Sequence, residues 1–220
     1  MRQSHLPFIT QMHANADVMA TMGGTRDAAA SRLYLAQNVA HWLDHGYGMY
    51  VLQTREHGAL AGRAGLKFTV TDEGGAIELA YAFDPDCWGR GYAVEISTAL
   101  VGLGFRLLPV DTLCAAAIRS NTASRRVLEK IGMRLLGDVE AAADNANANN
   151  ANNANNANNA NNANNANNAN NANNANANKA DNAVANAKPD SNAKVRYEIH
   201  RGQWRDQQDV ADANAALPSR

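Results

Sequence analysis

The chain has 220 residues and a formal net charge of −1, with 20 Lys and Arg against 21 Asp and Glu. A near-neutral chain has no global electrostatic preference for nucleic acid, so we expect no nucleic-acid partner. No apolar run approaches the roughly 20 residues that span a bilayer, and the first residues lack a signal peptide's apolar core, so we expect no membrane segment. The two cysteines, Cys87 and Cys114, match neither a disulfide framework nor a zinc site, which favours a reducing, cytoplasmic setting without a metal.

Helical and strand patterns follow one another through the first 139 residues. A hairpin turn is expected at Asp72–Gly75, Pro109 ends a helix, and Gly132 stops the next one. In chain order, the expected elements are helices over Pro7–Met19 and Arg26–His45, strands over Gly48–Thr54, Leu60–Thr71 and Ile77–Phe83, a helix from Ala93 to Leu107, a strand over Asp111–Ile118, a helix over Ser124–Ile131 and a strand over Met133–Val139.

A tract of almost pure Ala and Asn follows, from Asp144 to about Asn192, with nine consecutive Ala-Asn-Asn triplets at 148–174. Burying methyl groups cannot offset the entropy of ordering such a segment, and Asn is a poor helix former. We therefore expect a disordered insertion, with a self-associating Asn ladder as the alternative. Beyond it, Val195–Ile199 alternates apolar and polar residues like a half-buried antiparallel strand. The tract is thus a long loop between two paired strands, which costs little closure entropy.

These patterns predict one α+β domain in three layers, with a mostly antiparallel sheet flanked by helices. The residues outside the tract suffice for one hydrophobic core. The expected organisation is a main part at 1–143, the insertion at 144–193, a last strand at 194–204 and a polar, frayed tail at 205–220.

The most informative segment is the turn between the strand ending at Phe83 and the helix that begins near Ala93. Two glycines, Gly89 and Gly91, open this helix. The first amides of a helix have no intrahelical partner, the macrodipole is positive there, and glycines let a phosphate approach. The segment Gly89–Ala93 therefore predicts a site for a phosphorylated ligand.

Two motifs, about 30 residues apart, resemble those of the GNAT superfamily of acyl-CoA N-acyltransferases, and of its RimJ/RimL-type branch in particular. They are Trp88-Gly-Arg-Gly-Tyr-Ala93 and Asn121-Thr-Ala-Ser124, which leads on to Met133. The likeness covers about 8–139 and 194–204. It implies that acetyl-CoA is the cosubstrate and that the turn holds its pyrophosphate. The cofactor-binding residues implied are Ala82, Phe83, Trp88, Gly89, Arg90, Gly91, Tyr92, Ala93, Asn121 and Ser124.

The chain departs from the family pattern in two places. Family members begin with a strand before the first helix, whereas this sequence enters almost directly at Leu6-Pro-Phe-Ile9. Without that strand, Met49–Thr54 is expected to be an exposed sheet edge. A misplaced start codon or a truncation is the alternative to real loss of the strand. The Ala/Asn tract lies in a loop that often helps wall the acceptor pocket.

Acetyl transfer to an amine needs a base, an oxyanion donor and a proton for the thiolate, but no covalent intermediate. Glu78, which shares a strand face with Ala80 and Ala82, is the candidate base; a cross-strand pair is the alternative. A backbone N–H near Ala82 or Phe83 is the candidate oxyanion donor. Ser124 or a tyrosine is the candidate proton donor, although Ser124 also suits a helix cap.

The expected function is acetyl-CoA-dependent transfer of an acetyl group to a primary amine, either a protein N-terminus or a small amine, by a monomer or homodimer. Trp42 and Tyr47 are candidates for lining the acceptor site, or for core packing alone. Cys87 has no partnered His nearby, which disfavours a nucleophile there. The alternative function is a non-catalytic CoA-binding or self-associating module.

Overall fold

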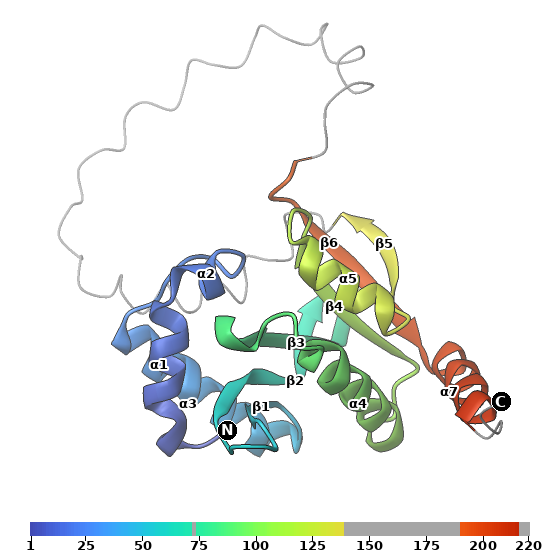
Figure 1. Cartoon of the computed structure of the whole chain (residues 1–220), viewed down its shortest axis with the longest axis horizontal. Helices are drawn as coiled ribbons and strands as arrows, with labels where there is room; N and C mark the ends of the chain where they lie inside the picture. The colour runs from blue at the N-terminus through green and yellow to red at the C-terminus, as the bar shows by residue number, and fades with distance from the viewer. Residues whose placement is uncertain (72–73, 139–189, 216–220) are drawn as a thin grey trace, which may run out of the picture.

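The computed structural model describes residues 1–71, 74–138 and 190–215. Within these residues six strands form one sheet in the order β1-β2-β3-β4-β6-β5 (Figure 1). Neighbouring strands are antiparallel, except that β3 and β4 pair in parallel. The strands are β1 (Met49–Gln53), β2 (Leu60–Thr71), β3 (Gly74–Phe83), β4 (Thr112–Ile118), β5 (Arg134–Asp138) and β6 (Lys194–His200). The mostly antiparallel sheet confirms the predicted α+β architecture.

Helices flank this sheet and complete the three layers (Figure 1). They are α1 (Leu6–Ala14), α2 (Ala16–Met19), α3 (Ala28–His45), α4 (Tyr92–Leu107), α5 (Thr122–Lys130) and α7 (Arg201–Ala215), with short 3₁₀ turns η1 (Gln3–His5) and η2 (Pro85–Cys87). No helix in the described ranges combines the length and apolar character needed to cross a membrane.

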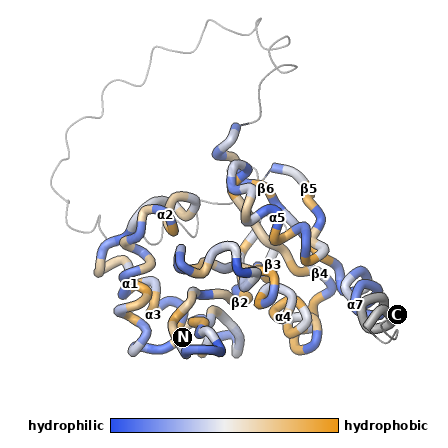
Figure 2. Tube along the Cα trace, in the orientation of Figure 1, coloured by the Kyte–Doolittle hydropathy of each residue, from blue (hydrophilic) through white to orange (hydrophobic). Residues whose placement is uncertain are grey.

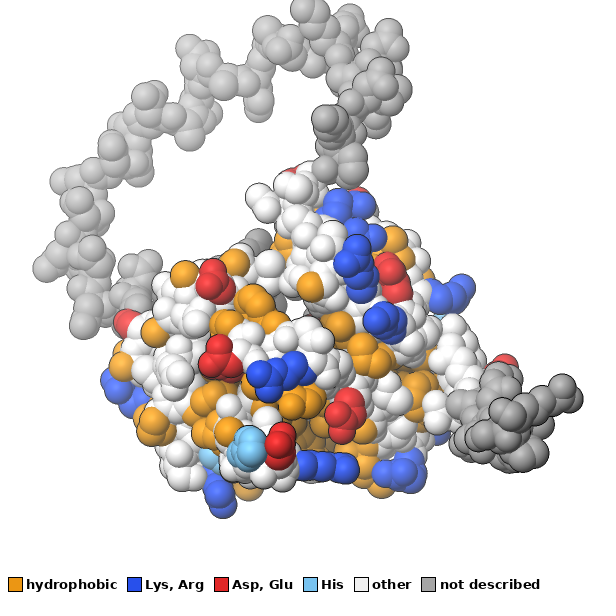
Figure 3. All heavy atoms as spheres, in the orientation of Figure 1, with side chains coloured by type: hydrophobic (Ala, Val, Ile, Leu, Met, Phe, Trp, Pro, Cys, Tyr) orange, Lys and Arg blue, Asp and Glu red, His pale blue; other side chains and the backbone are white. Residues whose placement is uncertain are grey.

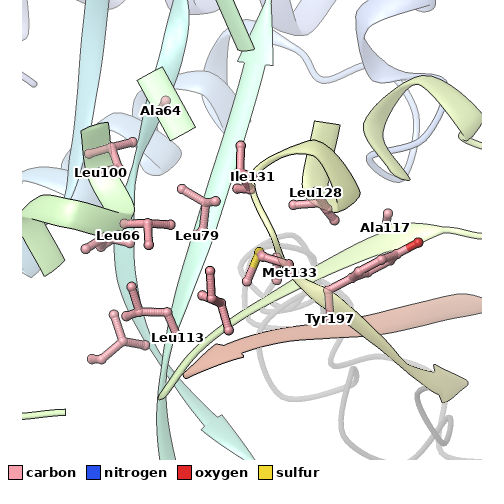
Figure 4. Close-up of a cluster of buried hydrophobic side chains, with 14 of the residues drawn as sticks. Ala64, Leu66, Leu79, Leu100, Leu113, Ala117, Leu128, Ile131, Met133 and Tyr197 are labelled. Carbon is pink, nitrogen blue, oxygen red and sulfur yellow. The ribbon is translucent and has the colours of Figure 1, made fainter. Parts of the chain in front are cut away.

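Two hydrophobic clusters lie on opposite faces of the sheet. The larger one joins α4 and α5 to alternate residues of the strands, with Leu79, Leu113 and Tyr197 nearly inaccessible (Figure 4). The smaller one joins α1 and α2 to Ala82 of β3. The apolar segments in Figure 2 follow these two interfaces. Because side chains alternate along a strand, β3 contributes Leu79 to one cluster and Ala82 to the other.

The N-terminal helix predicted over Pro7–Met19 is interrupted at Asn15. The Asn15 side-chain oxygen accepts from the amides of Asp17 (2.9 Å) and Val18 (3.2 Å), while its backbone is extended. An N-cap of this kind ends one helix and starts another, so the expectation of a single helix was wrong.

The polar C-terminal tail was expected to fray, but helix α7 begins directly after β6 and runs to Ala215. Its first residue, Arg201, donates to the carbonyl of Phe105 in the last turn of α4 and to those of Leu108 and Val110, which follow the helix. These carbonyls have no partner within α4, and a guanidinium with five donors satisfies several at once. Trp204 packs against the large cluster and fixes the next turn.

The strands at the two edges of the sheet are those expected from the sequence. Strand β1 lies at one edge, as expected for Met49–Thr54. At the other end β5 and β6 pair antiparallel, which confirms that the Ala/Asn tract connects paired strands. The tract itself, up to residue 189, and residues 72–73 of the hairpin turn lie outside the described residues.

Candidate active site

The turn between η2 and α4 has the geometry of an anion cradle. Gly89 and Gly91 have φ angles of 73° and 81°, and a Cβ added to either would meet nothing within 4 Å. Positive φ is the conformation that glycine adopts at least cost. Gly91 is the N-cap of the 16-residue helix α4. The backbone is therefore both bent and open at the end of a long helix.

The amides of this turn are free to bind a ligand. Trp88 N–H bonds to Pro85 O at 3.0 Å, and the next paired amide is Glu95, which bonds to Gly91 O at 3.0 Å. The five amides from Gly89 to Ala93 have no partner within the part of the chain that the structure describes. Unpaired amides at the positive end of a helix dipole suit a phosphate group. A coenzyme A pyrophosphate therefore fits the residues present.

The side chains around the turn have separate tasks. The Trp88 indole N–H donates to Phe83 O at 2.9 Å, which ties the turn to the end of β3. Tyr92 packs against Phe83, with ring centroids 6.4 Å apart. Arg90 is exposed. Basic side chains also gather over α5 on the face shown in Figure 3, and α5 contributes Arg125, Arg126 and Lys130. Both the turn and α5 therefore favour an anionic ligand.

The ladder between β3 and β4 ends before this turn. It contains one pair, Glu78 opposite Cys114, and β3 continues from there to Phe83 without a further pair; this gap in the backbone pairing is called the opening. The hydrogen bond from Asp84 N–H to Ala61 O (2.9 Å) shows which residues of β3 direct their backbone amides toward β2. Residues with even numbers direct their amides toward β2, and those with odd numbers direct theirs toward β4. Of the two candidate oxyanion donors, Phe83 therefore has its N–H at the opening, whereas that of Ala82 faces β2.

Ser124 and Tyr81 meet across the opening, on the face that α4 and α5 cover. The two hydroxyl oxygens are 2.9 Å apart, and Tyr81 O–H also lies 3.1 Å from Ser124 O. Asn121 caps α5 by accepting from Ser124 N–H at 3.0 Å. The cap is therefore Asn121, and the Ser124 hydroxyl is left for Tyr81. Burial is the main cause that raises the pKa of Tyr81 to about 12. Both hydroxyls thus carry their protons at neutral pH.

Glu78 lies on the opposite face of β3 from Tyr81. Its carboxylate is 3.3 Å from Lys67 Nζ and accepts from Thr69 Oγ1 at 3.4 Å. The side chain is 20% exposed, so it is in contact with water. Lys67 is directly opposite Glu78 in the β2–β3 ladder, which is the cross-strand pair considered for this residue. Ala80 and Ala82 follow on the same face and leave space beside it.

Trp42 and Tyr47 lie at the end of α3, next to the edge strand. Trp42 donates its indole N–H to Met49 O at 2.9 Å, and Tyr47 packs edge-on against His41. β2 separates this edge from β3, and the structure joins neither residue to Glu78 or Ser124 by a contact. These contacts are those of packing, and the acceptor role of both residues stays a prediction.

Neither cysteine has the surroundings of a nucleophile. Burial raises the pKa of Cys114 to about 11, and burial is also the first cause that raises the pKa of Cys87. A nucleophilic thiol needs the opposite shift. In the described part of the chain, no three His, Cys, Asp or Glu side chains are grouped as metal ligands.

Tyr81 is the site residue that the sequence left unnamed. Because side chains alternate along a strand, Tyr81 points to the opposite face from Ala82, the face covered by α4 and α5. Nothing in the local sequence shows that Ser124, 43 positions away, will contact it. That contact depends on how α5 packs on the sheet.

Comparison with known proteins assigns the first 134 residues to a family. The family description "Acetyltransferase (GNAT) domain" matches residues 1–134, more than half of the chain. A curated relative, the uncharacterized protein YkkB of Bacillus subtilis strain 168, is 29% identical over 117 residues, which cover 53% of this chain and 68% of that protein.

Solved structures share the fold at lower identity. An aminoglycoside acetyltransferase in complex with coenzyme A has a TM-score of 0.61 at 15% identity, covering 94% of this chain and 96% of the other. RimL, a ribosomal-protein α-N-acetyltransferase in complex with coenzyme A, has a TM-score of 0.54 at 18% identity, covering 64% of this chain and 80% of the other.

Proposed function

The chain belongs to the GNAT acetyltransferase family, and on this premise we propose that it moves an acetyl group from acetyl-CoA directly to a primary amine. The observation that carries the proposal is the cradle of unpaired amides at Gly89–Ala93, beside the opening between β3 and β4. Two proteins of similar fold were solved with coenzyme A, which supports the same cosubstrate here.

The reaction takes place in the opening, with different residues on its two sides. The turn at Gly89–Ala93 holds the pyrophosphate and so fixes the thioester near the end of β3. Phe83 N–H, which faces the opening, donates a hydrogen bond to the acetyl oxygen as negative charge develops on it. Holding both substrates together in this way removes the need for a covalent acyl-enzyme.

Proton transfers are divided between the two faces of β3. An amine enters from the Glu78 face, and the Glu78 carboxylate accepts its proton through a water molecule. When the C–S bond breaks, the thiolate leaves on the other face, where the hydroxyl of Ser124 gives it a proton and Tyr81 O–H donates in turn to Ser124. The raised pKa of Tyr81 keeps this pair protonated over the physiological range.

The finer assignment concerns the branch and the acceptor. The pair Asn121 and Ser124 and the Trp88-initiated turn support membership of the RimJ/RimL-like branch, whose acceptors include protein N-termini. A small amine is the other acceptor class, because the aminoglycoside acetyltransferase has a similar fold. We propose cytoplasmic action as a monomer or homodimer.

A screen of amines tests the proposal. Purified full-length protein is incubated with acetyl-CoA and a panel of N-terminal peptides, amino acids and di- and polyamines, and free thiol is measured. Thiol release that depends on the added amine is expected. Tight acetyl-CoA binding with no thiol release for any amine class contradicts the enzyme assignment.

A further inference from the structure

An arginine that lies between the sheet and the N-terminal helices has no acidic partner among the residues that the structure describes. Arg63 of β2 is 7% exposed. Its guanidinium donates to Tyr34 O–H at 2.6 Å and to the thioether of Met22 at 3.5 Å. Its Nε is buried without any partner among the described residues. A thioether is a weak acceptor, so most of this buried charge is uncompensated.

A second arginine, Arg26, adds another positive charge beside Arg63. Arg26 and Arg63 both lie over the ring of Tyr34, at 5.7 and 4.7 Å from its centroid. Burial is the main cause that lowers the pKa of Arg26, and the nearby charge of Arg63 lowers it further. No carboxylate of the described chain forms an ion pair with either guanidinium. The ring adds cation–π attraction but no negative charge.

The neighbouring histidine does not compensate this charge. His13 is fully buried, and burial, followed by Arg63 and Arg26, lowers its pKa to about 3. Its ring is therefore neutral at physiological pH. Ser31 donates its hydroxyl to Asp27 O, so His13 Nδ1 donates to Ser31, and His13 Nε2 has no partner in the described residues.

Three partly buried arginines elsewhere in the described chain do have acidic partners. Arg119 pairs with Asp138, Arg196 with Glu198 at 2.8 Å, and Arg201 lies 3.5 Å from Asp111. A buried charge without a partner is costly in a folded protein. The contrast indicates that Arg63 and Arg26 are held for an anion that comes from outside the chain.

The position of the two arginines connects them to the acceptor side of the opening. Arg63 is opposite Ala82 in the β2–β3 ladder, so the two side chains share the face that also carries Glu78. Thr21, next to Met22, accepts from Asn121 Nδ2 at 3.1 Å, which ties the loop over Arg63 to the start of α5. Arg63 therefore lies on the face of the sheet from which the amine enters in the proposed mechanism.

We propose that Arg63 and Arg26 form an anion subsite that binds a carboxylate or phosphate group of the amine acceptor. This inference rests on the proposed function, and it narrows the acceptor to amines that carry an acidic group, such as amino acids or aminoalkyl phosphates. The bidentate geometry of guanidinium suits both anions. The acyl donor's own phosphates are held by the turn at Gly89–Ala93, which opens α4 on the opposite face of the sheet from Arg63.

Matched pairs of acceptors test the subsite. Amino acids and aminoalkyl phosphates are compared with their neutral amides or alcohols, using the full-length protein and acetyl-CoA. We expect kcat/KM to be about 10- to 100-fold higher for the anionic member, the range for hydrogen bonds to a charged group. Equal kcat/KM within each pair overturns the proposal.

Variants of the two arginines then test whether these residues cause the preference for anionic acceptors. Arg63→Met is expected to remove the preference by raising KM for the anionic acceptor about 10- to 100-fold while kcat and the neutral acceptor change little. Arg26→Met, at a less buried position, is expected to act in the same direction and serves if Arg63→Met folds poorly. Arg32→Met removes an exposed charge of α3 and should preserve the preference. An equal loss for both acceptors of a pair in Arg63→Met and Arg26→Met shows a structural role and contradicts the subsite.

Two further measurements distinguish failure of the anion subsite from failure of the proposed acetyltransferase function. Malonate, added without acyl donor, should raise the melting temperature of the wild type but not of Arg63→Met; this supports the subsite even if no amine is acetylated. Amine acetylation without any anionic preference leaves the proposed function standing and removes the subsite. Arg63-dependent use of succinyl-CoA in preference to acetyl-CoA also overturns it, because the anion would then belong to the acyl group.

Discussion

The hydroxyl oxygen of Tyr81 lies 2.9 Å from that of Ser124, and the two come from a strand and a helix separated by 43 positions in the chain. This contact closes one side of the opening between β3 and β4. Glu78 lies on the other face of β3, where Lys67 holds it at 3.3 Å. In the proposed mechanism the proton donor and the proton acceptor therefore lie on opposite faces of β3.

Removing the Ser124 hydroxyl should slow turnover without loss of folding. We expect Ser124→Ala to lower kcat by about 10²-fold, the lower range for general acid catalysis, because the thiolate loses its proton donor. Tyr81→Phe should have a smaller effect, since Ser124 remains. The measurement is steady-state thiol release. Unchanged kcat in Ser124→Ala, with normal acetyl-CoA binding, assigns the proton to another group.

Glu78→Gln should lower kcat by about 10²- to 10³-fold and flatten the acidic limb of the pH–rate profile, because the amide cannot accept the amine's proton. Lys67→Met is the matched control, since it breaks the same ion pair but keeps the carboxylate. If the two variants lose activity equally, or if Glu78→Gln keeps the wild-type profile, the cross-strand pair is the whole role of Glu78.

Gly91→Ala should weaken acetyl-CoA binding. The φ angle of 81° strains any residue with a Cβ, by about 1 kcal/mol, and the methyl group would occupy the open space of the cradle. Gly58→Ala provides the control, because Gly58 also has a positive φ of 64° and open space but lies in a remote turn. Calorimetric titration should show a Kd at least tenfold higher for Gly91→Ala only. Equal affinities in the two variants contradict the cradle assignment.

Stability should fall in acid through His13. Burial lowers the pKa of His13 to about 3 from its ordinary 6.5, so below pH 6.5 the unfolded chain binds a proton that the folded chain does not. The contribution of His13 is therefore complete above pH 6.5 and is lost as the pH falls toward 3, by at most about 1.4 kcal/mol per pH unit.

Urea unfolding of wild type and His13→Met between pH 7 and 4 measures this slope. The variant should lose less stability over the range than the wild type does. His57→Met, which changes an exposed histidine, should retain the wild-type slope. Parallel curves for wild type and His13→Met would mean that His13 titrates normally in the folded protein.

Local sequence rules were sufficient for the sheet and the anion cradle. The period-two alternation of β6 and the glycines at 89 and 91 act through neighbouring residues, so a single sequence shows them. The same rules could have predicted the break in the N-terminal helix at Asn15, because Asn is a favoured N-cap. The apolar pattern on both sides of it suggested a continuous helix instead. Helix α7 was missed because its sequence is polar, and its start depends on Arg201 reaching the carbonyls of α4.

The side-chain contacts on which the two proposals rest could not be predicted from the sequence. The Tyr81–Ser124 pair depends on the packing of α5 against β3, and the burial of Arg63 depends on the loop that carries Met22. Arginine in a strand ordinarily faces solvent. Only the arrangement of the helices over this face shows that Arg63 is buried beside Arg26, with no carboxylate of the described ranges paired to either.

The central claim is direct transfer of an acetyl group from acetyl-CoA to an amine. It is tested most directly by incubating the full-length protein with isotopically labelled acetyl-CoA and the best amine from the screen, followed by mass spectrometry of protein and small molecules. We expect label in the N-acetylated amine, none on the protein, and a strongly reduced yield in Ser124→Ala. Label retained on the protein as an acyl adduct that the amine then consumes would contradict it.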